Sequence, residues 1–275
     1  MELPKNITRQ EKRRLRRWYA NVGKVSPDAS HSATGGLTIA DLDTYQEAAF
    51  RDICIWWNTQ QTIGGVAKPL TMGGVGGSGK TLTIALTLPT LKDASNNPVV
   101  VKYAAYTGKA AMVMQNRGLP ASTIHSLIYD SQTKGERVIF TLKPRSEIYA
   151  ELLVIDEASM IPDDMREDLE SLRIPILYVG DHAQLEPVSG AGCIMTNPQI
   201  KLEEVHRQAL DSGIIKVATD VRNSIPVPKG SYGVRSDAHK VGRDAVNDLN
   251  LLSNADVVIC HTNIQRQELN HSIRT

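Results

Sequence analysis

The feature that most constrains this chain is a glycine-rich loop at residues 74–81. The loop reads Gly-Val-Gly-Gly-Ser-Gly-Lys-Thr and fits the pattern GxxxxGK[ST]. A strand-like segment, Pro69–Met72, precedes it, and the helix-compatible run TLTIALTL overlaps its end. Glycines let successive backbone N–H groups turn toward phosphate oxygens, and a helix N-terminus adds a favourable dipole. The loop therefore predicts a nucleotide-phosphate site at a junction between a strand and a helix.

Most positions of this loop are candidate contacts to the nucleotide. Lys80 would neutralise the β- and γ-phosphates of ATP, and the Thr81 hydroxyl would bind Mg²⁺. The expected nucleotide-binding residues of the loop are Gly74, Gly76, Gly77, Ser78, Gly79, Lys80 and Thr81.

Two further strand-like runs end in polar side chains. Leu152–Ile155 is continuously apolar and is followed by Asp156 and Glu157. Open α/β sheets bind ligands at the carboxyl ends of their strands. Asp156 is therefore a candidate Mg²⁺ ligand, commonly through water, and Glu157 is a candidate base for an attacking water. Ile176–Val179 leads to Gln184, which could contact the γ-phosphate or that water.

The apolar runs alternate with helical stretches along the chain. Val99–Ala104 and Val257–Cys260 are two more continuous runs, and residues 41–57 carry apolar side chains at helical spacing. Continuous runs are typical of strands buried on both faces. Strands interleaved with helices predict an α/β fold with a parallel sheet.

Composition excludes some classes of protein. The chain has 275 residues and is 41% hydrophobic, which fits one large domain or two modest globular ones. It contains no run of 18 apolar residues and no apolar signal core near its start, so we expect neither a membrane partner nor secretion. Cys54, Cys193 and Cys260 lie far apart, which is typical of a reducing compartment such as the cytoplasm.

Charge is distributed unevenly. The net charge is +1, yet residues 1–24 carry eight Lys or Arg and two Glu, a net +6. The run 12–17 is a basic patch followed by Trp18 and Tyr19, and residues 26–38 have the composition of a linker. This segment is either a phosphate-contacting arm or a solvated terminal helix or tail.

These motifs together resemble superfamily 1B DNA helicases, the RecD-like and Dda-like enzymes of bacteria and bacteriophages. The resemblance covers about residues 38–275. Gln46 stands where the family reads adenine, and Tyr106 stands where a proline is usual. The matching segments are Gly74–Thr81, Thr107–Ala111, Ser122–Leu127, Ile155–Met160, Gly180–Val188 and Leu202–Gln208.

The resemblance implies two RecA-like domains of the P-loop NTPase type, with a parallel sheet covered by helices on both faces. These domains clamp ATP between them and move along single-stranded DNA, usually 5′ to 3′. Residues 1–37 would form a basic arm and linker, 38–199 the ATP-binding domain, and 200–275 part of the second domain. Arg207 would be an arginine finger that reaches the γ-phosphate across the cleft. ATP and Mg²⁺ are the implied cofactors, in the cytoplasm of a bacterial cell or a phage-infected host.

The resemblance also implies a DNA-contacting face. The candidates are small donors and cations on loops, which suit contacts to the sugar-phosphate backbone. They are Thr107, Lys109, Thr123 and His125, with Ser122 as a weaker one that could instead cap a helix. Residues 129–145 read as an inserted hairpin, which is either the family's strand-separating pin or an ordinary surface hairpin. We expect Phe140 in this segment to pack in the core.

The sequence ends at Thr275, shortly after Arg266 and Asn270. Two motifs that come later in the family are absent from it. We therefore expect a helicase truncated at its C-terminus, which binds ATP but hydrolyses it slowly. The alternative is a non-catalytic or partner-dependent ATP- and DNA-binding module, completed by a partner chain that supplies the missing motifs. A small-molecule kinase is disfavoured because it would have no need of the 180–188 and 202–208 segments.

Overall fold

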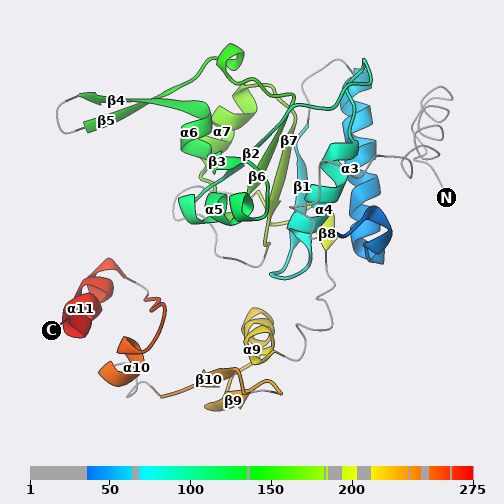
Figure 1. Cartoon of the computed structure of the whole chain (residues 1–275). Helices are drawn as coiled ribbons and strands as arrows, with labels where there is room; N and C mark the ends of the chain where they lie inside the picture. The colour runs from blue at the N-terminus through cyan, green and yellow to red at the C-terminus, as the bar shows by residue number, and fades with distance from the viewer. Residues whose placement is uncertain are drawn as a thin grey trace. The chain divides into compact units, whose positions relative to one another are not determined.

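A six-stranded parallel sheet organises the first part of the chain (Figure 1). The computed structural model describes residues 36–63, 68–134, 137–182, 184, 194–202, 212–234, 236–242, 248–260 and 262–274. The chain divides into two compact units, Met1–Val205 and His206–Thr275. In sheet order, the strands of the first unit are β3 (Ala121–Thr123), β2 (Val101–Ala105), β6 (Leu152–Asp156), β7 (Ile176–Gly180), β1 (Leu70–Gly74) and β8 (Ile200–Leu202).

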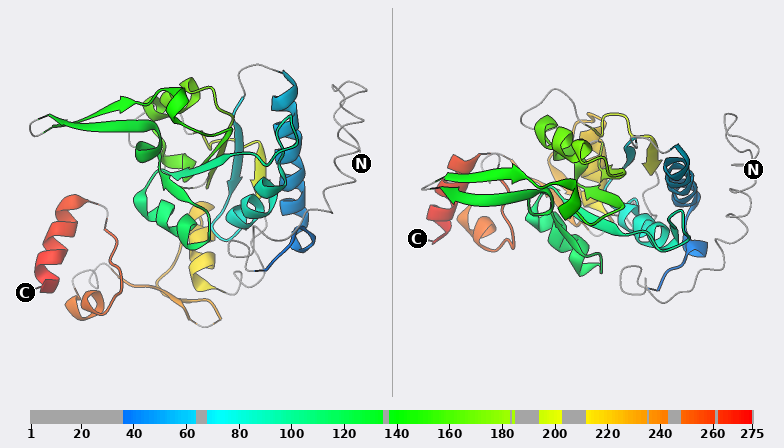
Figure 2. Two further views of the ribbon diagram at one scale, coloured as in Figure 1. Left: turned by 45° about the horizontal axis from the view of Figure 1, so that its top comes forward. Right: turned by 90° about the horizontal axis from the view of Figure 1, so that it is seen from above.

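Helices cover both faces of this sheet (Figure 2). They are α3 (Thr44–Ile63), α4 (Lys80–Thr87), α5 (Gly108–Asn116), α6 (Ile124–Ile128) and α7 (Asp163–Ser171). Short 3₁₀ turns, η2 (Ile39–Asp41), η3 (Leu88–Thr90), η4 (Arg145–Glu147) and η5 (Ala158–Met160), connect them. Strands alternating with helices are what the sequence predicts, so the α/β fold class is confirmed.

The core shows why the central strands are apolar without alternation. In β6, Leu152 and Val154 pack in one hydrophobic cluster with α3 and α4, whereas Leu153 and Ile155 pack in a second cluster with α6 and α7. Successive side chains of a strand point to opposite faces, so a sheet covered on both sides must be apolar at every position. A third, smaller cluster lies under α5.

Local signals set the start of α7. Pro162 immediately precedes the helix, and Asp163 and Asp164 occupy its first turn. Proline is compatible with a helix start because no intrahelical partner is needed there, and the carboxylates favour the positive end of the helix dipole.

An antiparallel hairpin interrupts the first unit between α6 and η4. Its strands are β4 (Tyr129–Lys134) and β5 (Arg137–Leu142), and their register runs from Tyr129 opposite Leu142 to Lys134 opposite Arg137. The hairpin expected within residues 129–145 is therefore present.

The boundary between the units differs from the expected one at residue 200. Strand β8 pairs in parallel with β1, with Met72 opposite Ile200 and Gly74 opposite Leu202. Residues 200–202 are thus the edge strand of the first sheet, because Ile200 and Leu202 complete the core beside α3.

The second unit is smaller and contains α9 (Gly213–Arg222), β9 (Gly230–Tyr232), β10 (Ala238–Lys240), α10 (Leu249–Ser253) and α11 (Asn263–Arg274). Asp237 fixes the start of α9 by accepting hydrogen bonds of 2.7 Å from the Gly213 N–H and the Ser212 hydroxyl. The strand expected at Val257–Cys260 is not formed in the described part of this unit, where the segment has no ladder partner.

Within the described ranges, no helix is both long and apolar enough to cross a membrane.

We predict that Ile176→Ala, in β7, lowers the free energy of unfolding by about 2–5 kcal/mol. The wild-type side chain is only 1% exposed, so its truncation leaves a cavity in the core. The matched control is Ile139→Ala, in the hairpin, where the side chain is 43% exposed and the expected loss is under about 1 kcal/mol. Urea titration followed by the fluorescence of Trp56 and Trp57 in α3 measures both values. Equal losses would contradict this assignment of the core.

Candidate active site

The candidate site lies where neighbouring strands of the sheet end. Strands β6, β7 and β1 are adjacent and parallel, and Gly73 of β1 lies opposite Gly180 of β7. Their carboxyl ends therefore meet at one edge, and each is followed by a motif singled out in the sequence. The structure thus brings together the phosphate loop, the Asp156–Glu157 pair and the turn after β7, as expected for an open α/β sheet.

The phosphate loop has the backbone geometry that its glycines permit. Gly77 and Gly79 have φ angles of +83° and +82°, a region that L-residues with side chains rarely adopt. A Cβ atom on Gly74 would lie 2.4 Å from the Ser78 Oγ, so that position has no room for a side chain. Helix α4 begins at Lys80, directly after its N-cap Gly79, so Thr81 lies in the first turn that follows the loop.

Lys80 closes the loop on itself. Its Nζ donates to the carbonyl oxygens of Gly74 at 2.6 Å and Val75 at 3.0 Å. The ammonium group is thus held at the mouth of the loop, beside the residues that would surround a phosphate. The buried Ser78 Oγ has no hydrogen-bond partner among the described residues, and a group of this kind suits a polar ligand.

Gln46 joins the start of α3 to this loop. Its backbone N–H donates to the Asp43 Oδ1 at 2.8 Å, and its Oε1 accepts from the Asp43 N–H at 3.2 Å, which is a capping box. Its Nε2 lies 3.5 Å from the Ser78 carbonyl oxygen, and the side chain is 1% exposed. The structure therefore places Gln46 against the phosphate loop, while the contact to adenine stays a prediction.

Three carboxylates, those of Asp156, Glu157 and Asp181, belong to the site. Burial raises the pKa of Asp156, although the Glu157 N–H, Lys80 and Arg117 each favour its charged form. Burial also raises the pKa of Glu157, and the neighbouring Asp156 and Asp181 add to this, against the effect of Lys80. A Glu with a raised pKa is well matched to accepting a proton near neutral pH.

Asp181 is the site residue that the sequence interpretation missed. It follows β7 directly and is 6% exposed, close enough to Glu157 to affect its pKa. The sequence held only a partial signal, because Asp181 comes shortly after the apolar run of β7, as Asp156 follows the apolar run of β6. Only the sheet order places these two strand ends side by side.

Two expected nucleotide contacts are less well placed by the structure. Gln184 has an exposed side chain, and its N–H donates to the Asp181 carbonyl at 3.2 Å. Arg207 lies outside the described residues, as do Ala183 and residues 185–188 of the segment Gly180–Val188. The roles of Gln184 and Arg207 stay predictions.

The expected DNA-contacting residues lie along the same edge of the sheet. Ala105, at the end of β2, is opposite Asp156 on one side and Thr123 on the other. Thr107 follows β2, and Lys109, in the first turn of α5, is exposed. One strand end therefore separates the carboxylates from the candidate DNA residues.

Both threonines act as helix caps. The Thr107 Oγ1 accepts from the Ala110 N–H at 3.2 Å, and the Thr123 Oγ1 accepts from the Ser126 N–H at 3.2 Å. The capping role proposed for Ser122 thus belongs to Thr123, because α6 starts one residue after it. A cap orients each hydroxyl, and contact of these residues with DNA stays a prediction.

The aromatic side chains at the root of the hairpin correct one expectation. Phe140 is 52% exposed and lies outside the core. Its ring centroid is 5.4 Å from that of His125, in an edge-on arrangement. Phe140 lies in β5 of the two-stranded hairpin, which projects from the six-stranded sheet (Figure 1), so it is not part of the core that this sheet forms with its helices.

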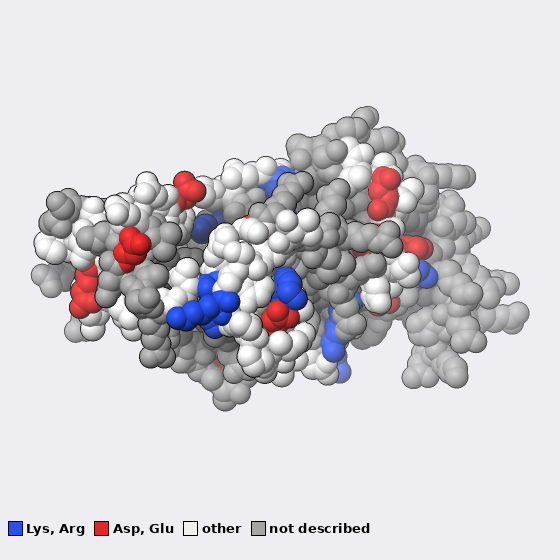
Figure 3. Space-filling model, turned by 90° about the horizontal axis from the view of Figure 1, so that it is seen from below, with Lys and Arg blue, Asp and Glu red and all other residues white. Residues whose placement is uncertain are grey.

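The described basic side chains form small separate groups on the face shown in Figure 3. The basic arm predicted for residues 1–24 lies outside the described residues. A role for that arm in binding phosphate stays a prediction.

Comparisons with known proteins agree with these motifs. The family model of the AAA domain matches residues 58–227, more than half of the chain. The chain is 35% identical over 127 residues to the ATP-dependent RecD2 DNA helicase of Deinococcus radiodurans, covering 43% of this chain and 17% of that protein. It is 28% identical over 140 residues to the RecBCD enzyme subunit RecD of Buchnera aphidicola, covering 43% and 23%.

Solved structures of Pif1 helicases are also similar. A Bacteroides Pif1 bound to single-stranded DNA has a TM-score of 0.45 and 20% identity, over 84% of this chain and 56% of that one. Pif1 helicase from Candida albicans has a TM-score of 0.45 and 19% identity, over 84% and 53%. The chain spans less than a quarter of the length of the two curated relatives. The resemblance to RecD-like helicases of superfamily 1B is confirmed, and the chain belongs to the AAA-domain family.

Proposed function

We propose that this chain binds Mg·ATP and hydrolyses it as the motor part of a DNA helicase or translocase, moving 5′ to 3′ on single-stranded DNA in the cytoplasm. The observation that carries the proposal is the meeting of three motif-bearing strand ends at one edge of the sheet. A phosphate loop alone would support only nucleotide binding. The half-buried carboxylates of Asp156 and Glu157 beside it support hydrolysis.

Each residue of the site has a role that its chemistry supports. Lys80 neutralises the β- and γ-phosphates once it exchanges its two carbonyl partners for phosphate oxygens. The oxygens of Thr81 and Asp156 are the hard ligands that Mg²⁺ prefers. Glu157 accepts the proton of the attacking water, and its raised pKa favours this step. Gln184 and Arg207 would sense and stabilise the γ-phosphate.

The proposal places DNA along the neighbouring strand ends. Thr107, Lys109, Thr123 and His125 would contact sugar and phosphate, which gives binding without preference for sequence. The β4–β5 hairpin stands beside this row, since His125 of α6 contacts both Tyr129 and Phe140. We propose it as the element that separates the strands.

A partner-dependent module is the second candidate. Val257 and Ile259 are 67% and 91% exposed, on a segment without a ladder partner in the described part of the second unit. Such a segment can pair with a strand from a partner chain. ATP hydrolysis measured with and without single-stranded DNA separates the candidates, because a motor is stimulated and a module shows neither turnover nor response.

Lys80→Ala should abolish nucleotide binding, because it removes the cation held at the mouth of the phosphate loop. Glu157→Gln should bind Mg·ATP about as well as the wild type but lose turnover by about 10²-fold or more, since an amide accepts no proton from water. Titration with a fluorescent ATP analogue and an assay of phosphate release measure the two effects. Failure of Glu157→Gln to bind would contradict the assigned roles.

The carboxylate cluster predicts a pH effect on the free protein. Because the folded-state pKa of Glu157 is raised, its charge destabilises the folded state at pH 7, and this penalty disappears as the pH falls below its ordinary value of 4.5. Glu157→Gln should therefore raise the Tm at pH 7, and this difference in Tm should close as the pH falls.

Thermal melts from pH 4.5 to 8 measure this difference. The control is Glu147→Gln, an exposed Glu in η4 outside the cluster, which should leave the Tm unchanged. A Tm difference for Glu157→Gln that grows in acid would contradict the prediction.

DNA binding should be insensitive to sequence and strongly dependent on salt, because the proposed contacts are to the backbone. Deleting residues 1–24 removes a net charge of +6 and should flatten the slope of log affinity against log salt concentration. Fluorescence anisotropy of a labelled oligonucleotide at several salt concentrations measures the slope. An unchanged slope would show that the arm does not touch DNA.

A further inference from the structure

The first strand of the hairpin is tied to a helix that follows the carboxylate pair. The Tyr129 hydroxyl, at the start of β4, donates to the Asp168 Oδ2 of α7 at 2.6 Å. Both side chains are half-buried. Arg166 is a cation only two residues from Asp168, but it pairs with Asp163 at 3.1 Å. Among the described residues, the Asp168 carboxylate therefore has the Tyr129 hydroxyl as its hydrogen-bond donor. The contact joins residues 39 apart in sequence.

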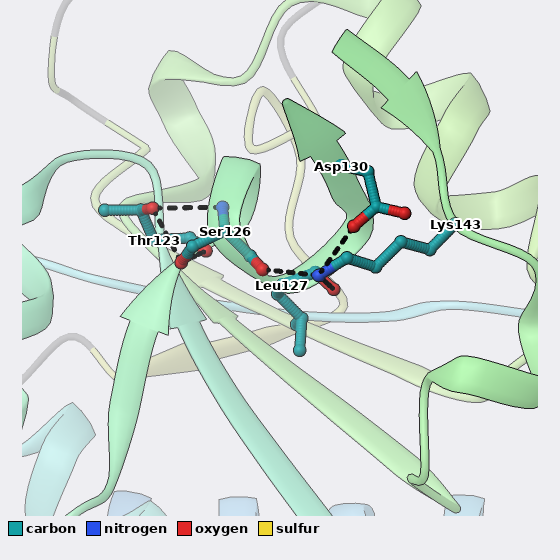
Figure 4. Close-up of polar contacts among 5 residues, drawn as sticks. All are labelled: Thr123, Ser126, Leu127, Asp130 and Lys143. Atoms are coloured by element: carbon teal, nitrogen blue, oxygen red, sulfur yellow. Dashed lines mark hydrogen bonds and ion pairs between the residues drawn. The ribbon is translucent and has the colours of Figure 1, made fainter. Parts of the chain in front are cut away.

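The second strand of the hairpin is tied to α6 (Figure 4). The Lys143 Nζ donates to the Ser126 carbonyl at 2.9 Å and lies 3.5 Å from the Leu127 carbonyl and 4.0 Å from the Asp130 carboxylate. The Lys143 N–H donates to the Ile128 carbonyl at 2.8 Å. These are carbonyls at the end of a helix, which lack intrahelical partners and favour a cation.

Apolar packing adds to these two polar contacts at the root of the hairpin. Tyr129 and Leu142, which are paired across the hairpin, both pack against the cluster that includes Met165 and Leu169 of α7. Beyond this root, the hairpin projects away from the sheet (Figures 1 and 2). Its direction therefore depends on the few contacts that hold its first residues.

Helix α7 continues directly from the nucleotide site. It begins at Asp163, six residues after Glu157, and only η5, Ile161 and Pro162 intervene. We propose that the Tyr129–Asp168 hydrogen bond fixes the direction of the hairpin relative to the nucleotide site, so that Tyr129 and Asp168 are positioning residues for strand separation. The proposal rests on the proposed helicase function.

The charges around the contact keep it formed near neutral pH. Burial raises the pKa of Tyr129, and the Asp168 and Asp164 carboxylates raise it further, so the phenol stays a donor. A hydrogen bond to an ionised acceptor is also stronger than one between neutral groups.

The test removes the hydrogen bond and keeps the packing. Tyr129→Phe retains the ring that contacts His125 and Phe140, and Asp168→Ala removes the acceptor from the other side. Asp168→Asn keeps an oxygen that can accept the Tyr129 hydrogen bond, so this variant should behave much more like the wild type than Asp168→Ala does. The matched control is Tyr149→Phe, at a side chain that is 79% exposed.

Two readouts separate anchoring from function. Hydrogen exchange of the amides of residues 129–142 should speed up about tenfold in Tyr129→Phe and Asp168→Ala, the size expected for loss of a hydrogen bond to a charged group. Strand displacement per ATP hydrolysed should fall about three- to tenfold, while DNA-stimulated hydrolysis stays within about twofold. Tyr149→Phe should match the wild type in both.

Each result decides one part of the proposal. Unchanged exchange in both variants would overturn the anchor. Faster exchange with unchanged displacement per ATP would overturn the positioning role. If the wild-type chain separates no strands, the positioning role in strand separation fails. ATP hydrolysis with and without single-stranded DNA still tests the proposed motor function, and the exchange rates still decide whether the hydrogen bond anchors the hairpin.

Discussion

The parallel pairing of β2, β6, β7 and β1 is the constraint on which the rest of the molecule depends. It places Ala105 beside Asp156, and Gly73 beside Gly180, so every loop that carries chemistry leaves the sheet at the same edge. A shift of any strand by one residue would turn its side chains to the opposite face. The two cores, which take alternate residues of β6 and β7, prevent that shift, and the stability of the core thereby holds the site in register.

The sequence was sufficient for the parts of the fold that follow local rules. The phosphate loop and the strands at β1, β2, β6 and β7 were predictable because glycine patterns and continuous apolar runs have direct physical causes. Edge elements were not predictable in this way. Strand β8 has only three residues, and its place beside β1 depends on tertiary packing. Phe140 is apolar yet half-exposed, and only the projection of its hairpin from the sheet explains this.

Asp181 and Val257–Cys260 also show that a prediction from sequence is limited where tertiary structure decides the outcome. Asp181 was a missed site residue, whereas Val257–Cys260 was expected as a strand that did not form. Asp181 reads as an ordinary turn residue until the sheet order brings β7 beside β6, where its carboxylate affects Glu157. Val257–Cys260 has the composition of a buried strand, yet Val257 and Ile259 are exposed in the described part of the second unit. The propensity of a segment to form a strand is realised only where a neighbouring strand supplies the ladder.

The charges of the free site explain why metal and nucleotide would bind together. Asp156, Glu157 and Asp181 belong to the site, and burial with mutual repulsion raises the pKa of Glu157. Lys80, the cation that eases this repulsion, is engaged with the Gly74 and Val75 carbonyls. A phosphate that draws Lys80 onto itself reduces the compensation of the carboxylates, and a divalent cation restores it. In the proposed function each ligand would thus improve the site for the other, and by linkage the gain would be equal in both directions.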